Sequence, residues 1–405
     1  MAYTTSSSTS YGQRLTGSLK NIGSGFIMFI IGTVVLFWNE GNFVKTQKSL
    51  KEAEGVLVRV SNVSEVDPSL NGKLIHATAL ADSKETLTDD LFGVSETAIS
   101  ISRTVEYYQY EEQSSTTTKD KIGGGQEHVT TYTYEKKWTS QPIDSETFTD
   151  SKYKKSNFAL TSIAAKSERA KEVSFGGYRL PGFIISSISG SVPAIVNLTD
   201  EEIEQWKNVL ARDMSMPYSE VAQMVQVNGN IVYFGKSPSV PTIGDVRVTL
   251  TKVMPCDISI IAKVVGSTFE EYTASNGKTV SQVAMGTVSS EKMFADAHSS
   301  NKLWTWVLRL VGVILVISGL RAMFSILPAL FKIIPFLGKI IGAGVGFICG
   351  IGGFVWSLVV ISIAWLTYRP LIGIPMLLLA IAGIWYLRKR GKEAKVAEEN
   401  TVTSN

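Results

Sequence analysis

An uncharged stretch of 26 residues, 341–366 (IGAGVGFICGIGGFVWSLVVISIAWL), places the tightest limit on how this chain can fold. As a helix rising 1.5 Å per residue it would be about 39 Å long, more than the roughly 30 Å hydrocarbon core of a bilayer requires. A surface helix of a soluble protein would need a polar face, and this stretch has none. We therefore interpret it as a membrane span and the chain as an integral membrane protein.

Three further apolar stretches have the length of a span: residues 22–38, 303–320 and 370–387. The first is too long for the apolar region of a signal peptide, and no small-residue cleavage site follows it, so we interpret it as an uncleaved anchor. The sequence thus predicts four transmembrane helices, one N-terminal and three C-terminal. An even number of spans puts both chain ends on the same side of the membrane.

Basic residues set the predicted orientation, because cytosolic loops are enriched in Lys and Arg. The tail 388–405 begins with a basic cluster and ends acidic, and the loop 321–340 holds three cations, whereas Arg369 is the one cation between the third and fourth spans. We expect both tails and the loop 321–340 in the cytosol and residues 39–302 across the membrane. One count opposes this orientation, since more cations follow the first span than precede it: Lys45, Lys48, Lys51 and Arg59 against Arg14 and Lys20.

Two cytosolic segments have distinctive compositions. Residues 1–21 are rich in Ser and Thr and poor in apolar side chains, which is typical of a disordered tail. Residues 325–339, within the loop 321–340, are apolar but interrupted by two prolines. They are too short to span the bilayer, so we expect an interfacial segment there.

The region 39–302 is long enough to bury a core of its own. Alternating β-branched and aromatic residues predict a strand-rich fold, with strands at 55–60, 73–80, 98–111, 129–138, 230–234, 245–253 and 258–265. Thr199 followed by Glu202 predicts the start of a helix over 199–213, and residues 43–54 have a polar helical pattern. We expect an extracytosolic α+β domain.

Four glycines spaced by four residues give one face of the third span small side chains: Gly338, Gly342, Gly346 and Gly350. In lipid, small residues at this spacing let two helix backbones approach closely. We predict a helix-packing face and a homo-oligomer. The alternative is that glycine is simply frequent in membrane spans.

Arg309 lies about two turns inside the second span, where a charge needs a partner or water. The predicted topology puts Glu40, just beyond the first span, on the same side of the bilayer. We therefore predict an ion pair between Glu40 and Arg309. The alternative is that Arg309 extends alone to the membrane surface.

Patterns for catalysis and for cofactor binding are missing. The three histidines are far apart in the sequence, and there is no phosphate-binding loop, nucleophile elbow or dinucleotide fingerprint, so we expect no metal and no cofactor. A net charge of +3 does not indicate nucleic acid as a partner. Asn62 and Asn197 begin N-x-[ST] triplets and are possible glycosylation sites in a eukaryotic lumen.

Three function classes fit these patterns. A non-enzymatic membrane scaffold that self-associates fits best, and its partners would be the lipid bilayer, further copies of the chain and other membrane proteins. A channel or transporter component comes second, with the glycines of the third span lining a pathway. A membrane-bound enzyme is the weakest of the three.

Several short motifs are shared with one known family: FWNEG at 37–41, GKLIH at 72–76, RTVEYYQY at 103–110, GDVRV at 244–248, TW at 305–306 and LTYRPL at 366–371. On these motifs the chain resembles the LUMA family, also called the transmembrane protein 43 family, over nearly its whole length. The resemblance implies four spans with a large lumenal domain and self-association. In animals it also implies the endoplasmic reticulum and inner nuclear membrane, with lamin- and emerin-type partners, whereas a bacterial relative would lie in the cytoplasmic membrane. It implies no catalytic residues.

Overall fold

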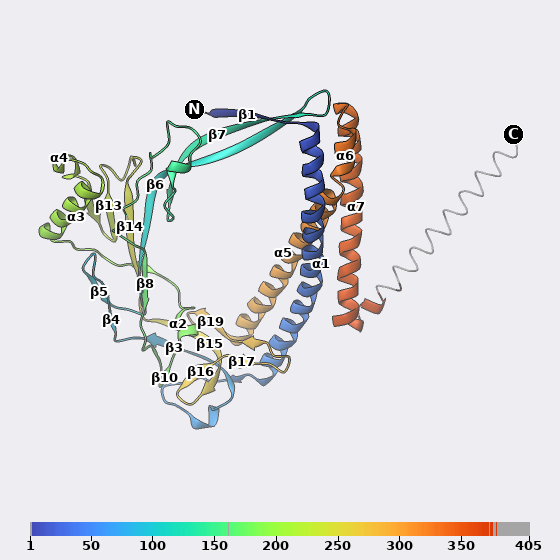
Figure 1. Cartoon of the computed structure of the whole chain (residues 1–405). Helices are drawn as coiled ribbons and strands as arrows, with labels where there is room; N and C mark the ends of the chain where they lie inside the picture. Colours follow the sequence, from blue (N-terminus) through green and yellow to red (C-terminus); the bar gives the residue numbers. More distant parts are fainter. Residues whose placement is uncertain (1, 161, 372, 376–377, 379–405) are drawn as a thin grey trace. The chain divides into compact units, whose positions relative to one another are not determined.

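The computed structural model describes residues 2–160, 162–371, 373–375 and 378 (Figure 1). The chain divides into two compact units. A strand-rich unit contains residues up to 7, 52–117 and 128–295, and a helical unit contains residues 8–51, 118–127 and those from 296 onward.

The larger sheet of the strand-rich unit has eight strands in the order β1-β7-β6-β14-β13-β12, with β8 paired to β6 and β11 paired to β14. Its strands are β1 (Tyr3–Thr9), β6 (Ser100–Asp120), β7 (Gln126–Thr139), β8 (Lys166–Arg169), β11 (Val192–Pro193), β12 (Val225–Asn228), β13 (Ile231–Phe234) and β14 (Val246–Val253). The central pair β6 and β14 is antiparallel, with Val105 opposite Val248. Both side chains are buried, as their alternating pattern requires.

The second sheet has seven strands in the order β10-β9-β3-β15-β16, with β19 paired to β15 and β2 paired in parallel to β3. Its strands are β2 (Val58–Arg59), β3 (Leu74–Asp82), β9 (Ser174–Phe175), β10 (Tyr178–Arg179), β15 (Cys256–Val265), β16 (Thr268–Glu270) and β19 (Gln282–Met285). Two small sheets pair β4 (Thr86–Asp89) with β5 (Val94–Thr97) and β17 (Tyr272–Thr273) with β18 (Thr279–Val280). Short helical turns complete the unit: η1 (Pro68–Leu70), η2 (Ser145–Thr147), α2 (Gly182–Ile185) and α4 (Tyr218–Val221).

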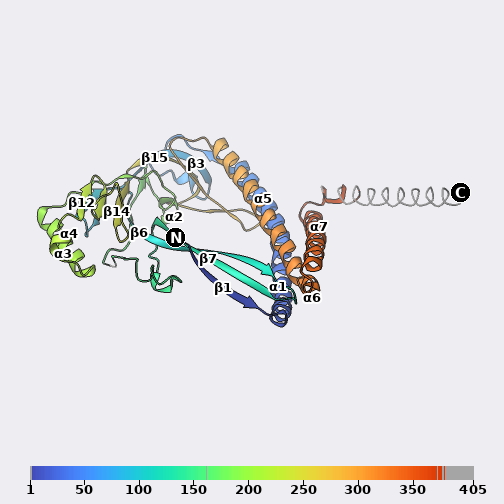
Figure 2. The ribbon, with the colours of Figure 1, turned by 90° about the horizontal axis from the view of Figure 1, so that it is seen from above.

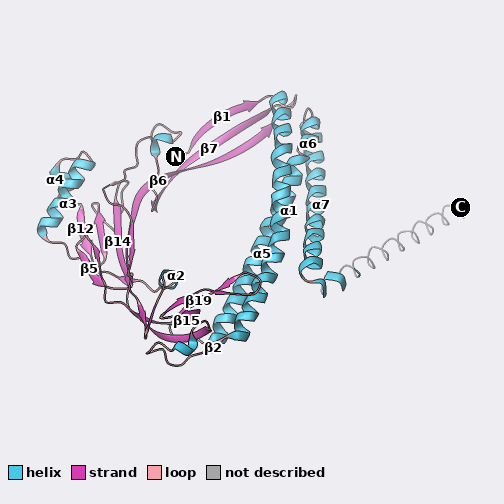
Figure 3. Cartoon of the chain, turned by 60° about the horizontal axis from the view of Figure 1, so that its bottom comes forward, coloured by secondary structure: helices cyan, strands magenta, loops and turns pink. Residues whose placement is uncertain are grey.

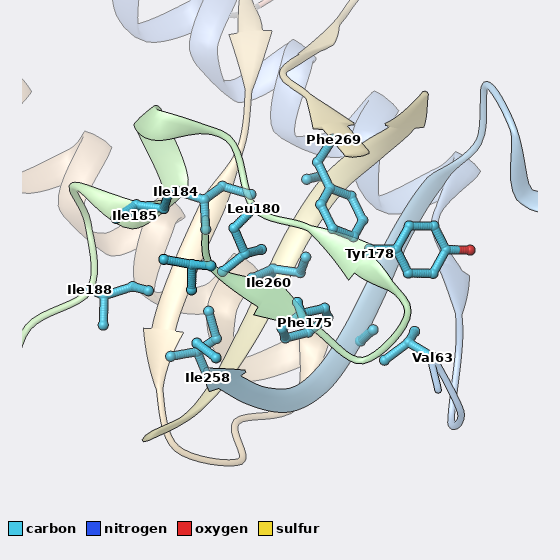
Figure 4. Close-up of a cluster of buried hydrophobic side chains, with 14 of the residues drawn as sticks. Val63, Phe175, Tyr178, Leu180, Ile184, Ile185, Ile188, Ile258, Ile260 and Phe269 are labelled. Atoms are coloured by element: carbon cyan, nitrogen blue, oxygen red, sulfur yellow. The ribbon is translucent and has the colours of Figure 1, made fainter. Parts of the chain in front are cut away.

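Each main sheet has its own apolar core. Figure 4 shows the core on the second sheet, where Phe175, Tyr178 and Phe269 pack against Ile260 of β15. The core on the first sheet is closed by α3 (Asp200–Asp213), whose Trp206 stacks on Phe92 with ring centroids 5.2 Å apart. The alternation of apolar residues along the strands predicts that one face of each sheet is buried in this way.

The helical unit contains α1 (Tyr11–Val56), α5 (Ser290–Met323), α6 (Ile326–Phe331) and α7 (Pro335–Tyr368), of which α1 and α5 extend into the residues of the strand-rich unit. Figures 1 and 3 show α1, α5 and α7 side by side, and Figure 2 shows the same grouping from above. Among the described residues, three helical stretches are long and apolar enough to cross a membrane: 11–56, 290–331 and 336–368. These three contain the first three predicted spans. The fourth, 370–387, lies largely outside the described residues, as does all of the tail 388–405.

The N-terminal segment differs from the expected disordered tail over 1–21. Residues 3–9 form β1, which lies next to β7 in the large sheet, and α1 begins at Tyr11. Ser and Thr lower the hydrophobicity of this segment, but Thr and Tyr also suit a half-exposed strand, so sheet pairing overrides the compositional signal. At its other end α1 continues without a break through the polar residues 43–54. In the loop, 326–331 form α6 and α7 already begins at Pro335.

The tip of the β6–β7 hairpin, residues 118–127, belongs to the helical unit. The Arg14 guanidinium is 3.2 Å from an Asp120 carboxylate oxygen and donates to the Gly124 carbonyl at 2.7 Å, while the Gly123 amide donates to the Ile333 carbonyl at 3.2 Å. The predicted orientation places Asp120 on one side of the membrane and Arg14 and Ile333 on the other. A polar hairpin exposed to lipid cannot cross hydrocarbon, so this contact and that orientation exclude each other in a bilayer.

Candidate functional site

Small residues recur every seven positions along the contact between α1 and α5. The residues that meet are Gly25 with Gly319, Gly32 with Gly312, and Asn39 with Thr305. A Cβ placed on Gly319 would lie 2.6 Å from the Phe29 amide nitrogen, so the two backbones are in direct contact there. A seven-residue repeat keeps a seam facing its partner along both helices, and absent side chains permit the close approach.

The seam ends in polar interactions. The Asn39 amide donates to the Thr305 carbonyl at 3.0 Å, and one residue further along α1 the carboxylate of Glu40 meets Arg309. Nε of Arg309 is 2.5 Å from Oε1 of Glu40, and Nη2 is 2.8 Å from Oε2. The two residues that the sequence suggested as an ion pair are therefore brought together in bidentate geometry. This geometry is the strongest arrangement of an arginine with a carboxylate.

Two tryptophans supply the remaining partners of this pair, Trp365 of α7 and Trp306 of α5. Nε1 of Trp365 on α7 donates to Oε2 of Glu40 at 2.8 Å. The Arg309 guanidinium lies 4.8 Å from the ring centroid of Trp306 and 5.8 Å from that of Trp365. Glu40 is 1% exposed and Arg309 is 16% exposed, so both charges are held by protein groups rather than by water. We call Glu40, Arg309, Trp306 and Trp365 the ion-pair cluster.

Two further contacts hold α7 against α1. Nε1 of Trp356 donates to the Thr33 hydroxyl at 3.0 Å. The Tyr368 ring packs over Gly41, where an added Cβ would lie 2.6 Å from the ring. The ring centroids of Tyr368 and Phe37 are 5.7 Å apart. All three helices therefore converge near the ion-pair cluster, because each tryptophan or tyrosine of α7 meets a small or hydrogen-bonding residue of α1.

The predicted glycine face of the third span does not contact α1; it meets α6, Lys332 and Arg321 at the end of α5. A Cβ on Gly338 would collide with Lys332, one on Gly342 would lie 3.6 Å from Pro328, and one on Gly350 would lie 3.8 Å from Arg321. Gly346 has open space, and its carbonyl accepts from Arg321 at 3.3 Å. Gly353, which the sequence pattern did not single out, packs more tightly within the bundle, because an added Cβ would lie 2.7 Å from Ile317 of α5.

The remaining predicted positions lie in the strand-rich unit. Asn62 and Asn197 are both exposed. Asn62 accepts from the Ser64 amide at 2.9 Å, and Thr199 caps α3, so each acceptor triplet lies in an ordered turn. Within the described part of the chain, no three His, Cys, Asp or Glu side chains are placed to hold a metal ion.

Sequence reasoning missed Trp365 and the α1–α5 seam. A signal for the seam was present, because Gly25 and Gly32 are seven residues apart and so are Gly312 and Gly319. Two glycines seven residues apart indicate a helix contact only when an antiparallel partner helix has two glycines at the same spacing. No comparable signal pointed to Trp365.

Comparison with known proteins gives a consistent result. A family model described as Transmembrane protein 43 matches residues 107–370, more than half of the chain. The human protein named Transmembrane protein 43 is 25% identical over 398 residues, covering 95% of this chain and 94% of its own length. The mouse protein of that name is 25% identical over 89% of this chain and 87% of its own length. A Drosophila melanogaster protein named Transmembrane protein 43 homolog is 25% identical over 90% of this chain and 93% of its own length. No solved structure matches the chain at a significant level.

Proposed function

Because this chain belongs to the transmembrane protein 43 family, we propose that it is a non-enzymatic, multi-span membrane scaffold that self-associates and helps to organise membrane protein complexes. The single observation that carries the proposal is the ion-pair cluster. Its bidentate pair joins α1 to α5 and its Trp365 hydrogen bond joins α7 to α1, so three helices are fixed to one another. We therefore assign this cluster a structural rather than a catalytic role.

Packing between the helices also favours a scaffold over a channel. The α1–α5 seam brings backbone atoms into contact, which leaves no space for water between these two helices. The cavity in the helical unit that touches Phe29, Leu320 and Trp356 has a volume of about 380 Å³ and an apolar lining. An ion pathway needs polar groups or water along its length.

Self-association is proposed to use the surface of α7 around Gly346. An added Cβ on Gly346 meets no described atom within 4 Å outside the neighbouring backbone of its own helix, and the adjacent Phe347 is 69% exposed. A second copy could therefore approach the α7 backbone at Gly346 and cover this apolar side chain. Van der Waals packing of this kind is the main attraction between helices in lipid.

The test compares two glycines of the same helix. Gly346→Leu is expected to reduce chemical crosslinking between copies, and the oligomer mass in native mass spectrometry, in lipid nanodiscs. Gly344→Leu is the matched control, because Gly344 also has open space but lies two residues away on the opposite side of the helix. Equal loss in both variants, or none in either, would count against this surface. Unchanged oligomers with altered ion flux would favour a channel component.

We further propose that in an animal cell the chain resides in the endoplasmic reticulum and inner nuclear membrane, with lamin- or emerin-type proteins among its partners. In a bacterium the corresponding location would be the cytoplasmic membrane. The long apolar helices and the animal relatives support membrane residence as such. Fluorescence microscopy of the tagged chain, beside markers of both compartments, tests the location. A plasma-membrane signal in animal cells would contradict it.

A further inference from the structure

A cavity lies where α1 leaves the predicted first span and α7 ends. It has a volume of about 570 Å³, which is within the range of ligand sites, and it is lined by Val44, Gln47, Lys48 and Lys51 of α1 together with 368–371. The four α1 residues have the spacing i, i+3, i+4 and i+7, so they form one face of the helix. We call this cavity the basic pocket.

Three cations line the basic pocket: Lys48, Lys51 and Arg369. Within the described residues, none of the three forms an ion pair with a carboxylate. The Arg369 guanidinium instead lies 4.6 Å from the ring centroid of Phe43. Three positive charges at one cavity repel one another, and an anion bound among them would relieve this repulsion.

Two acidic residues of α1, Glu40 and Glu52, are occupied by other groups. Glu40 is held by Arg309 and Trp365 in the ion-pair cluster. Glu52 accepts hydrogen bonds from the Ser275 amide at 2.8 Å and from the Tyr272 hydroxyl at 2.9 Å. Neither carboxylate forms an ion pair with Lys48, Lys51 or Arg369 among the described residues, although the charge of Glu40 acts on Arg369 at longer range.

The lining also contains apolar groups that a small soluble anion would not need. Val44, Pro370 and Leu371 line the pocket, and Leu371 is 91% exposed. Tyr368 and Trp365 lie at the same end of α7, and such aromatic residues are enriched at the level of lipid headgroups. A ligand with a negative headgroup and hydrocarbon chains satisfies both parts of the lining.

We propose that the basic pocket binds the phosphate headgroup of an anionic phospholipid, with Lys48, Lys51 and Arg369 around the phosphate and Leu371 beside an acyl chain. Basic pockets at membrane boundaries bind lipid headgroups through the same charge complementarity. Two of the four cations that follow the first span and oppose the rule for cytosolic loops, Lys48 and Lys51, line this pocket. For these two lysines the proposal gives a role in lipid binding rather than in orientation.

The experiment uses the full chain in native mass spectrometry, released from nanodiscs that contain phosphatidylcholine with a small share of phosphatidylglycerol. Wild type is expected to retain phosphatidylglycerol in preference to phosphatidylcholine. A Lys48→Gln, Lys51→Gln double variant is expected to retain it about 30-fold less well, since each lysine near a membrane surface contributes roughly a fivefold factor. Oligomer mass and thermal stability in pure phosphatidylcholine show whether the variant is folded.

Lys302→Gln is the matched control. Lys302 is an exposed lysine of α5 beside Asn301, whose side chain donates to the Phe43 carbonyl at 3.3 Å, and it does not line the pocket. This variant should bind phosphatidylglycerol like wild type. Three outcomes would overturn the proposal: no preference for phosphatidylglycerol in wild type, an equal loss in Lys302→Gln, or full displacement of the lipid by inorganic phosphate. The last would identify the site as one for a free anion.

Discussion

Arg309 donates two hydrogen bonds to the carboxylate of Glu40, a residue 269 positions earlier in the chain, through Nε at 2.5 Å and Nη2 at 2.8 Å. The indole N–H of Trp365, on the third helix α7, donates a further hydrogen bond to the Glu40 carboxylate. One buried acidic residue thus holds together α1, α5 and α7, three helices that are far apart in the sequence. The seam of small residues between α1 and α5 aligns the helices so that the pair can form.

Removing either charge of this pair should destabilise the helical unit strongly. Glu40→Ala or Arg309→Ala leaves the other charge buried without its partner, at a cost of about 3–5 kcal/mol in the free energy of unfolding. A Glu40→Arg, Arg309→Glu exchange should recover part of this loss, because the ion pair is rebuilt while the Trp365 hydrogen bond is not. SDS titration of the chain in mixed micelles measures the effect. If the exchange recovered nothing beyond the single variants, the two residues would not interact.

The variant Trp365→Phe measures the contribution of the Trp365 hydrogen bond separately from that of the ion pair. It removes the indole N–H but leaves an aromatic ring near Arg309, so the expected loss is about 1.5–3 kcal/mol, the usual contribution of a hydrogen bond to a charged group. The same titration measures it. A loss as large as that of Glu40→Ala would mean that the tryptophan packs the bundle rather than only completing the carboxylate.

The seam predicts different outcomes for two glycines of α1. Gly25→Ala places a Cβ 2.7 Å from the Gly319 carbonyl oxygen and should cost about 1–3 kcal/mol through overpacking. Gly23→Ala meets nothing within 4 Å, and because alanine is the better helix former it should be neutral or stabilising by up to about 1 kcal/mol. Thermal unfolding in nanodiscs compares the two variants. Equal stabilities would mean that the helices do not touch along this line.

The hairpin tip tests the orientation of the chain. From the contact between Arg14 and Asp120 we expect Arg14→Cys and Asp120→Cys, in a background with Cys256 and Cys349 replaced by Ser, to be joined by a short bifunctional maleimide. Both cysteines should also react with an impermeant maleimide from the same side of sealed vesicles. Labelling from opposite sides, or glycans on Asn62 or Asn197 in a eukaryotic host, would instead support the predicted orientation and exclude the contact in the membrane.

The capping box of α3 predicts a local pH dependence. Hydrogen bonds from the Thr199 amide and hydroxyl lower the pKa of Glu202 below its ordinary value of 4.5. A depressed pKa in the folded state means that this stabilisation is present above pH 4.5 and is lost as the pH falls through the lowered pKa. Hydrogen-exchange protection of α3 should therefore decrease below pH 4.5. Glu202→Gln should remove the dependence, and Thr199→Ala should cost about 1 kcal/mol at neutral pH.

Local patterns predicted several elements well. The Thr199 cap appears with its reciprocal partner Glu202, and the predicted strand 245–253 is observed as β14 over Val246–Val253. The family resemblance, based on short motifs, is confirmed by the family model. These features depend on residues close together in the chain, or on a match to relatives, so no knowledge of packing was needed. The fourth span and the membrane orientation stay predictions.

Partners between distant elements were harder to predict. Glu40 and Arg309 could be proposed because both are charges near apolar stretches, and a charge in hydrocarbon needs a partner. Trp365 carried no such signal, since a tryptophan near a span end is as compatible with the lipid interface as with a buried carboxylate. The glycine row of the third span was detectable, but its spacing alone did not show which surface it meets.

The sequence by itself determined that three long stretches of this chain prefer hydrocarbon and that the region between the first two forms strands, because both follow from the side chains within one element. Only the tertiary structure decided which helices touch, at which glycines, and around which charge. That choice depends on matching two surfaces in three dimensions. Glycines seven residues apart on α1 allow a close helix contact only because the antiparallel helix α5 has glycines at the same spacing.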